Sequence, residues 1–112
     1  MSVTARTMAT GTICHDAIIV DKSDGPSYVT FTMVVGYHDK GNGKKPHQVR
    51  VTVRSYRADH KRMLGLLRMG TEVTTEGRAH ADCRGDDHGR VWATAMVAID
   101  EDDRAGKLEV VS

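Results

Sequence analysis

Residues 57–67 read RADHKRMLGLL and interrupt a chain whose other apolar stretches alternate with a period of two. In this segment Met63, Leu64 and Leu67 have the spacing of one helix face. Gly70 follows shortly afterwards, where a glycine commonly ends a helix. The segment therefore predicts a single short helix in a chain that is otherwise β-structured.

The remainder of the chain predicts β-strands, because β-branched residues dominate its apolar content and alternate with polar ones. The expected strands cover residues 4–14, 28–37, 47–56, 71–81 and 90–99. Clusters of Gly, Asp, Asn and Ser separate them, as turns require. Three strands, one short helix and two further strands are the order of a five-stranded Greek-key barrel, the OB-fold. We expect one such domain over residues 1–112, all-β apart from its helix.

The charges of this chain are segregated along it, although its net charge is only +1. Residues 40–62 contain eight Lys or Arg and one acid, whereas the segment 100–112 is acidic. A near-neutral chain that separates its charges can present one attractive face to phosphate. The alternative interpretation is ordinary solvated surface charge.

No segment of the sequence has the apolar length of a signal peptide or of a membrane span. We therefore expect a cytoplasmic protein with no membrane partner. Its two cysteines, Cys14 and Cys83, are expected to be reduced thiols, since two cysteines do not define a disulfide framework.

One cluster of potential metal ligands lies late in the chain: His80, Asp82, Cys83, Asp86 and His88. It lacks a paired C-x-x-C and a second ligand pair at the spacing of structural zinc sites. No orienting group or oxyanion site accompanies a Cys–His pair in it. We expect a polar loop here, with no metal, no cofactor and no catalytic residue.

The third expected strand is the most informative for function, since its two faces differ in chemistry. Alternation puts Val49, Val51 and Val53 on a core face. The opposite face carries Gln48, Arg50, Thr52, Arg54 and Tyr56. Single-stranded nucleic acid offers unstacked bases and a string of phosphates, so its groove needs flat surfaces and cations. The strand fits such a groove, although a solvated polar face would use similar residues.

Residues 66–77, LLRMGTEVTTEG, resemble the segment of bacterial single-stranded DNA-binding proteins in which the helix ends and the fourth strand begins. Gly70 would end the helix, and Gly77 would be the glycine at which the barrel bends. Three further segments resemble motifs of this family in the same order: residues 11–16 (GTICHD), 37–40 (YHDK) and 89–94 (GRVWAT). The resemblance extends over about residues 8–100.

The resemblance implies non-enzymatic, largely sequence-independent binding of single-stranded DNA in replication, recombination or repair. The positions that match aromatic positions of the family are Tyr37, Arg50, Tyr56, Arg84 and Trp92. Two of these are arginines here, which shifts binding from stacking toward phosphate attraction. A hairpin after the second strand would close over the DNA with Lys40, Lys44 and Lys45.

The resemblance further implies a nucleoid-associated homo-oligomer, either a tetramer or a dimer, with replication or repair proteins as partners. The segment 100–112 departs from the acidic, hydrophobic tip with which the family recruits such enzymes. Two alternatives remain open. One is a primosomal-type OB adaptor at replication forks. The other is an OB interaction module without nucleic-acid binding that docks a basic partner through residues 100–103.

Overall fold

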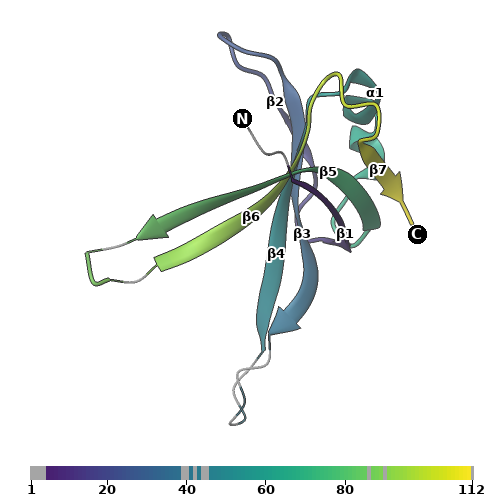
Figure 1. Cartoon of the computed structure of the whole chain (residues 1–112). Helices are drawn as coiled ribbons and strands as arrows, with labels where there is room; N and C mark the ends of the chain where they lie inside the picture. Colours follow the sequence, from purple (N-terminus) through teal and green to yellow (C-terminus); the bar gives the residue numbers. More distant parts are fainter. Residues whose placement is uncertain are drawn as a thin grey trace.

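A computed structural model of the chain describes residues 5–38, 41, 43, 46–85, 87–89 and 91–111, without the side chains of residues 38, 82–85 and 91–94. Seven strands of this described part form one sheet (Figure 1). In chain order the elements are β1 (Arg6–Ile13), β2 (Ile18–Val20), β3 (Tyr28–His38), β4 (His47–Ser55), α1 (Ala58–Lys61), the 3₁₀ turn η1 (Leu64–Leu66), β5 (Glu72–Gly85), β6 (Val91–Ile99) and β7 (Lys107–Val110).

A closed barrel is formed by five of the described strands in the order β1-β3-β4-β6-β5, with β1 and β5 pairing to complete the ring. Strands β4 and β6 pair in parallel, whereas the other described pairs are antiparallel. Strand β2 adds to β3, and β7 adds to β5. A five-stranded barrel with a helix between its third and fourth strands is the OB-fold, so the expected fold class is confirmed.

The expected helix over residues 57–67 is split into α1 and η1, with the low-propensity Gly65 inside η1. Gly70 lies beyond η1 with a φ of 90°, in a turn that a residue with a side chain adopts only with strain. Its N–H donates to the carbonyl of Ile13, which ties the turn to β1. Neither helical element is long and apolar enough to cross a membrane. Strands β2 and β7 are absent from the sequence-based prediction, because three or four residues are too few for a period to show.

The barrel core is filled from the inner faces of its strands and from the segment after η1. Its buried members are Ile13, Ala17, Val29, Phe31, Met33, Val53, Leu67, Val73, Val97, Ile99 and Leu108. Val51 packs partly buried against them, as expected. Val49 is 44% exposed, so its expected place in the core is wrong. The reason is that the β3–β4 hairpin runs beyond the end of the barrel (Figure 1).

Strand β5 is long enough to pair with different strands along its two halves. Its first half lies between β1 and β7, and from Arg78 onward it pairs with β6 in a hairpin that projects from the barrel (Figure 1). Gly77 lies at the change of partner, as its resemblance to the family's bending glycine implies. A Cβ there would meet the Ala98 carbonyl oxygen at 2.7 Å, so only glycine fits without displacement.

Candidate nucleic-acid interface

The outward side of β3, β4, β6 and β5 is one continuous surface, here called the outer face. Its members with described side chains are Thr30, Thr32, Val34 and Tyr37 of β3, Gln48, Arg50, Thr52 and Arg54 of β4, Met96 and Ala98 of β6, and Arg78 and His80 of β5. Tyr56, directly after β4, extends this side beyond the strand. Its N–H donates to the carbonyl of Ile99 at 2.9 Å, which holds this point of the chain against β6.

A β-bulge in β3 brings Tyr37 to the outer face. Val34 is the last residue in regular register with β4, and Gly36 is the next to pair, so Val35 is an extra residue. A shift of one residue exchanges the two sides of a strand, and Tyr37 consequently stands opposite Gln48. The Tyr37 side chain is 67% exposed, so its ring is accessible for stacking.

Arg50 is held on the outer face by its neighbour on the same strand. Its Nε and Nη2 both donate to Oε1 of Gln48, at 3.0 and 2.7 Å. A guanidinium has five N–H donors, so three remain for another acceptor. Within the described residues Arg50 makes no ion pair, and its side chain is exposed. Its positive charge is therefore oriented by Gln48 and is not balanced by any acid of the described residues.

Arg54 lies at the other end of β4, over the Tyr28 ring. The guanidinium carbon is 5.1 Å from the ring centroid, and Tyr28 in turn packs against Tyr56 with centroids 5.1 Å apart and the rings tilted by 52°. Arg54 also makes no ion pair with the described residues, and its buried Nε has no hydrogen-bond partner. A buried donor without a partner is costly, so this nitrogen is a local weakness in the packing around Arg54. Thr52 lies between the two arginines along the strand, with its hydroxyl 3.4 Å from that of Thr32.

The acidic segment after β6 is partly engaged by arginines. Arg78 donates to the Asp100 carboxylate at 3.3 and 3.4 Å, and these hydrogen bonds raise the pKa of Arg78 above its ordinary value. Arg6 forms a salt bridge of 3.0 Å with Asp103. Two of the four acids at positions 100–103 are thus already paired within the barrel.

Arg57 belongs to the basic segment 40–62 but takes no part in the outer face. It donates to the Asp59 carboxylate through two nitrogens, at 3.0 and 2.7 Å. Its Nη1 donates to the carbonyls of Asp103 and Gly106, which pins the loop before β7. The basic residues of this segment therefore serve two purposes: some lie on the outer face, whereas Arg57 holds the loop before β7.

Two cavities open beside Tyr56, and Tyr56 and Arg78 line both. The first, of about 520 Å³, lies between the loop before β3 and the segment after β6. It is lined by Lys22, Asp24, Gly25, Pro26, Tyr28, Tyr56, Arg78, Asp100 and Glu101. The second, of about 160 Å³, lies on the outer face and is lined by Arg54, Tyr56, Arg78, His80, Met96 and Ala98. Tyr28, which lines the first cavity, is not among the site residues expected from the sequence. Alternation from Thr30 and Thr32 nevertheless assigns Tyr28 to this side.

The structure brings six of the expected site residues together: Tyr37, Gln48, Arg50, Thr52, Arg54 and Tyr56. Arg84 and Trp92 are register partners in the β5–β6 hairpin, and their side chains lie outside the described part. Lys40, Lys44 and Lys45 lie outside the described residues altogether, together with the expectation that they close over a bound strand.

A Ser–His contact in the barrel wall has the chemical composition of a nucleophile and a base. The hydroxyl of Ser55 and Nδ1 of His60 share a hydrogen bond of 2.6 Å, and Asp59 lies 4.0 Å from Nε2. Ser55 is fully buried and His60 is 5% exposed, so a substrate has no access to the hydroxyl. The pair therefore joins the end of β4 to α1 as a structural contact. Within the described part of the chain, no group of three metal-ligating side chains is present.

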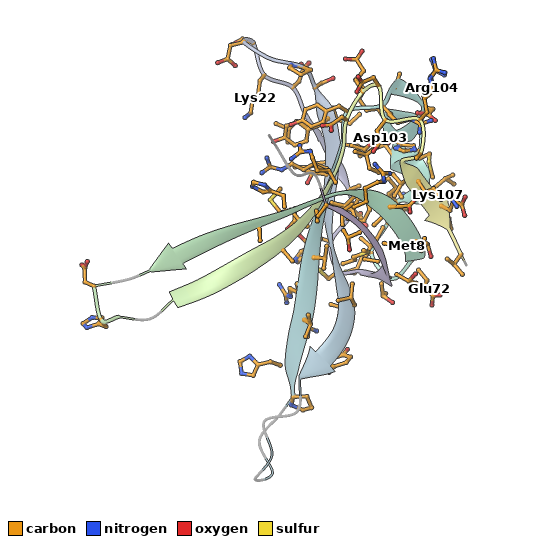
Figure 2. The ribbon with its side chains drawn as sticks, in the orientation of Figure 1. Met8, Lys22, Glu72, Asp103, Arg104 and Lys107 are labelled. Atoms are coloured by element: carbon orange, nitrogen blue, oxygen red, sulfur yellow. The ribbon has the colours of Figure 1, made fainter. Side chains whose placement is uncertain are left out.

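The surface of β1, β5 and β7 has a different chemistry from the outer face. Met8 and Glu76 are register partners there, as are Glu76 and Lys107. Figure 2 shows Met8, Glu72 and Lys107 together on the side of the barrel away from the β5–β6 hairpin. This surface carries both acids and a base. It therefore lacks the excess of positive charge that the described side chains of β4 present.

Two solved structures are similar to this chain over almost its whole length. A Plasmodium falciparum SSB in complex with ssDNA matches at a TM-score of 0.70 and 16% identity, covering 100% of this chain and 97% of the other. The small single-stranded DNA-binding protein from Streptomyces coelicolor matches at a TM-score of 0.64 and 18% identity, covering 99% and 93%. No protein-family model and no curated protein matches the sequence. The chain has the OB-fold of these single-stranded DNA-binding proteins.

Proposed function

We propose that this protein binds single-stranded DNA along its outer face, without catalysis and largely without sequence preference. The observation that carries the proposal is the pair Arg50 and Arg54, which lie on one strand without any acidic partner among the described residues. Aromatic rings stand at both ends of this pair, with Tyr37 at one and Tyr56 at the other. Both structurally similar proteins are single-stranded DNA-binding proteins, which supports the same ligand here.

The dimensions of the outer face suit a short run of nucleotides. From Gln48 to Tyr56 the chain spans about 26 Å at a strand rise of about 3.3 Å per residue. OB-folds bind roughly 4–16 nucleotides each, with bases on aromatic rings and phosphates on cations. In this arrangement Arg50 and Arg54 contact phosphates, and the rings of Tyr37 and Tyr56 receive bases.

The rival function of a protein-interaction module is less well supported by the acidic segment. Asp100 and Asp103 are paired with Arg78 and Arg6, so half of the four acids at positions 100–103 are already engaged and less charge is left for a basic partner. A primosomal-type adaptor shares the fold and the outer face, and its distinguishing features are a dimeric state and protein partners. We propose a homo-oligomer acting in replication, recombination or repair, and the mass in solution separates dimer from tetramer.

Titration of a labelled oligo-dT with the protein, followed by fluorescence anisotropy at several salt concentrations, tests the proposal. We expect the affinity to fall steeply with salt, because phosphate contacts release counterions. Arg50→Ala should reduce the slope of log K against log salt by about 0.7, the value of one single-strand phosphate contact. Arg104→Ala is the matched control, since Arg104 is exposed on the loop after β6 and lines neither cavity beside Tyr56. Absence of binding at low salt, or equal slopes for the two variants, would overturn the proposal.

A further inference from the structure

The charge along the proposed DNA path changes sign beyond Tyr56. The strand β4 presents Arg50 and Arg54 without an acidic partner in the described part of the chain, whereas the 520 Å³ cavity past Tyr56 is lined by Asp24, Asp100 and Glu101. Arg78 and Asp100 neutralise each other, so Asp24 and Glu101 stand against Lys22 and the lining keeps an excess of one negative charge. A phosphate is attracted at one end of the path and repelled at the other. A nucleotide at this end therefore binds with its base in the cavity and its phosphate outside.

The walls of the cavity suit a flat, hydrogen-bonding ring. Tyr56 is half-buried and lines this cavity as well as the smaller one beside Arg54, so its ring forms part of the wall between them. Tyr28 is 6% exposed and packs against Tyr56, which keeps the Tyr56 ring from turning freely. A volume of about 520 Å³ falls in the range of about 300–1,000 Å³ that small-ligand sites occupy.

The polar groups of the cavity favour one class of base. Within the described residues Glu101 makes no hydrogen bond or ion pair, and its side chain is exposed at the cavity mouth. A carboxylate only accepts hydrogen bonds, and the exocyclic amino group of cytosine is a donor that Asp and Glu recognise. Thymine has an N3–H donor but carries the O4 acceptor where cytosine has its amino group, so a carboxylate placed at that group is repelled by thymine.

We propose that this cavity is a base-recognition subsite, in which Tyr56 stacks on a base and Glu101 accepts from its exocyclic amino group, so that cytosine is preferred to thymine. This inference rests on the proposed function, since the subsite receives one nucleotide of a strand bound along β4. Figure 2 places Lys22, on the loop that forms the opposite wall, at the end of the molecule away from the β3–β4 hairpin. The selective position is therefore at one end of the bound strand and not in its middle.

A position scan measures the preference directly. Oligo-dT is compared with oligonucleotides of the same length that carry one dC, moved in turn through every position, by competition against a labelled oligo-dT. We expect dC to raise the affinity by about threefold to tenfold at positions near one end and to leave it unchanged elsewhere. In Glu101→Gln this gain should shrink toward unity, whereas Glu109→Gln on β7, a matched exposed acid outside the cavity, should retain it.

The outcomes separate the subsite from the function on which it rests. Binding of oligo-dT without a gain from dC at any position overturns the subsite and leaves the proposed function in place. A gain that Glu101→Gln fully retains overturns the role of Glu101. Absence of binding by every oligonucleotide at low salt overturns both proposals together.

Discussion

The guanidinium carbon of Arg54 lies 5.1 Å from the centre of the Tyr28 ring. A cation in this position is held by the ring quadrupole and not by a carboxylate, so it keeps its full charge toward a ligand. The ring beneath it is 6% exposed and fixed by Tyr56. Among the described contacts, Arg54 is thus oriented by aromatic packing and not by an acid.

Arg54→Lys tests this orientation, because lysine keeps the charge but loses the planar fork that lies over Tyr28. We expect weaker binding of oligo-dT with an unchanged salt slope, since the number of phosphate contacts is preserved. Arg54→Ala should lower both the affinity and the slope. Anisotropy titrations at several salt concentrations measure both quantities, and a lysine variant with wild-type affinity would contradict the role of the ring.

Tyr56→Ala should weaken binding by about 1–3 kcal/mol, the contribution of one base stacked on an aromatic ring. Its salt slope should stay close to that of the wild type, because no phosphate contact is removed. Tyr56→Phe keeps the ring and serves as the control. Loss of affinity in Tyr56→Phe equal to that in Tyr56→Ala would mean that the hydroxyl, and not stacking, is responsible.

Trp92 provides an optical test of the part of the site that only the sequence predicts. It is the single tryptophan of the chain and stands opposite Arg84 in the β5–β6 hairpin. If it contacts DNA as the resemblance implies, oligo-dT quenches its emission in proportion to the bound fraction. An emission that stays constant while anisotropy reports saturation removes Trp92 from the interface.

His60 makes stability depend on pH. Burial, the largest cause, lowers the pKa of His60 below its ordinary value of 6.5, although the Asp59 carboxylate opposes this shift and Arg57 adds to it. The unfolded chain then binds more protons than the folded one, so the free energy of unfolding falls as the pH drops below about 6.5. The stability is fully present above that pH and is lost as the pH falls through the folded pKa.

Urea unfolding at a series of pH values measures this dependence. His60→Asn removes the titrating group and retains a hydrogen-bonding atom close to the position of Nδ1. We expect the variant to lose less stability than the wild type between pH 7 and pH 5, the interval around the ordinary His value. Parallel curves for the two proteins would show that His60 does not titrate on unfolding.

Gly77→Ala should destabilise the barrel by about 1–3 kcal/mol, as overpacking does, because the new Cβ meets the Ala98 carbonyl oxygen at 2.7 Å. Gly65→Ala is the matched control, since nothing lies within 4 Å of its Cβ position and alanine favours the helical backbone of η1. Chemical denaturation compares the two. Equal stability of both variants would show that β5 can shift away from β6.

The sequence predicts the five barrel strands and the position of the helix because their apolar periods are long enough to count. It also predicts that Gln48, Arg50, Thr52 and Arg54 share one face, because one uninterrupted strand carries all four. Tyr37 lies on that face only because of the bulge at Val35, which alternation does not reveal. The sequence motif, and not the period, identified it.

The cavity beside Tyr56 is not predictable from alternation, because its walls come from segments far apart in the chain. Glu101 and Asp100 belong to a stretch whose composition suggests an acidic tail. The contacts of Arg78 and Arg57 hold that stretch against the barrel instead, where Asp100 and Glu101 line the cavity, and the chain then continues into β7, which pairs with β5. Which arginine meets which acid depends on tertiary packing, and charge counting along the sequence does not contain it.

The extra residue in β3 also says what a change of strand length would do. Gly36 already faces Val49 and Tyr37 already faces Gln48, so deleting Val35 would remove the bulge and leave these pairs as they are. The ring of Tyr37 would then stay on the outer face by simple alternation from Val34. Loop grafts and chimaeras that join this hairpin to another barrel therefore need to preserve the pairing of Tyr37 with Gln48, and they do not need the bulge itself.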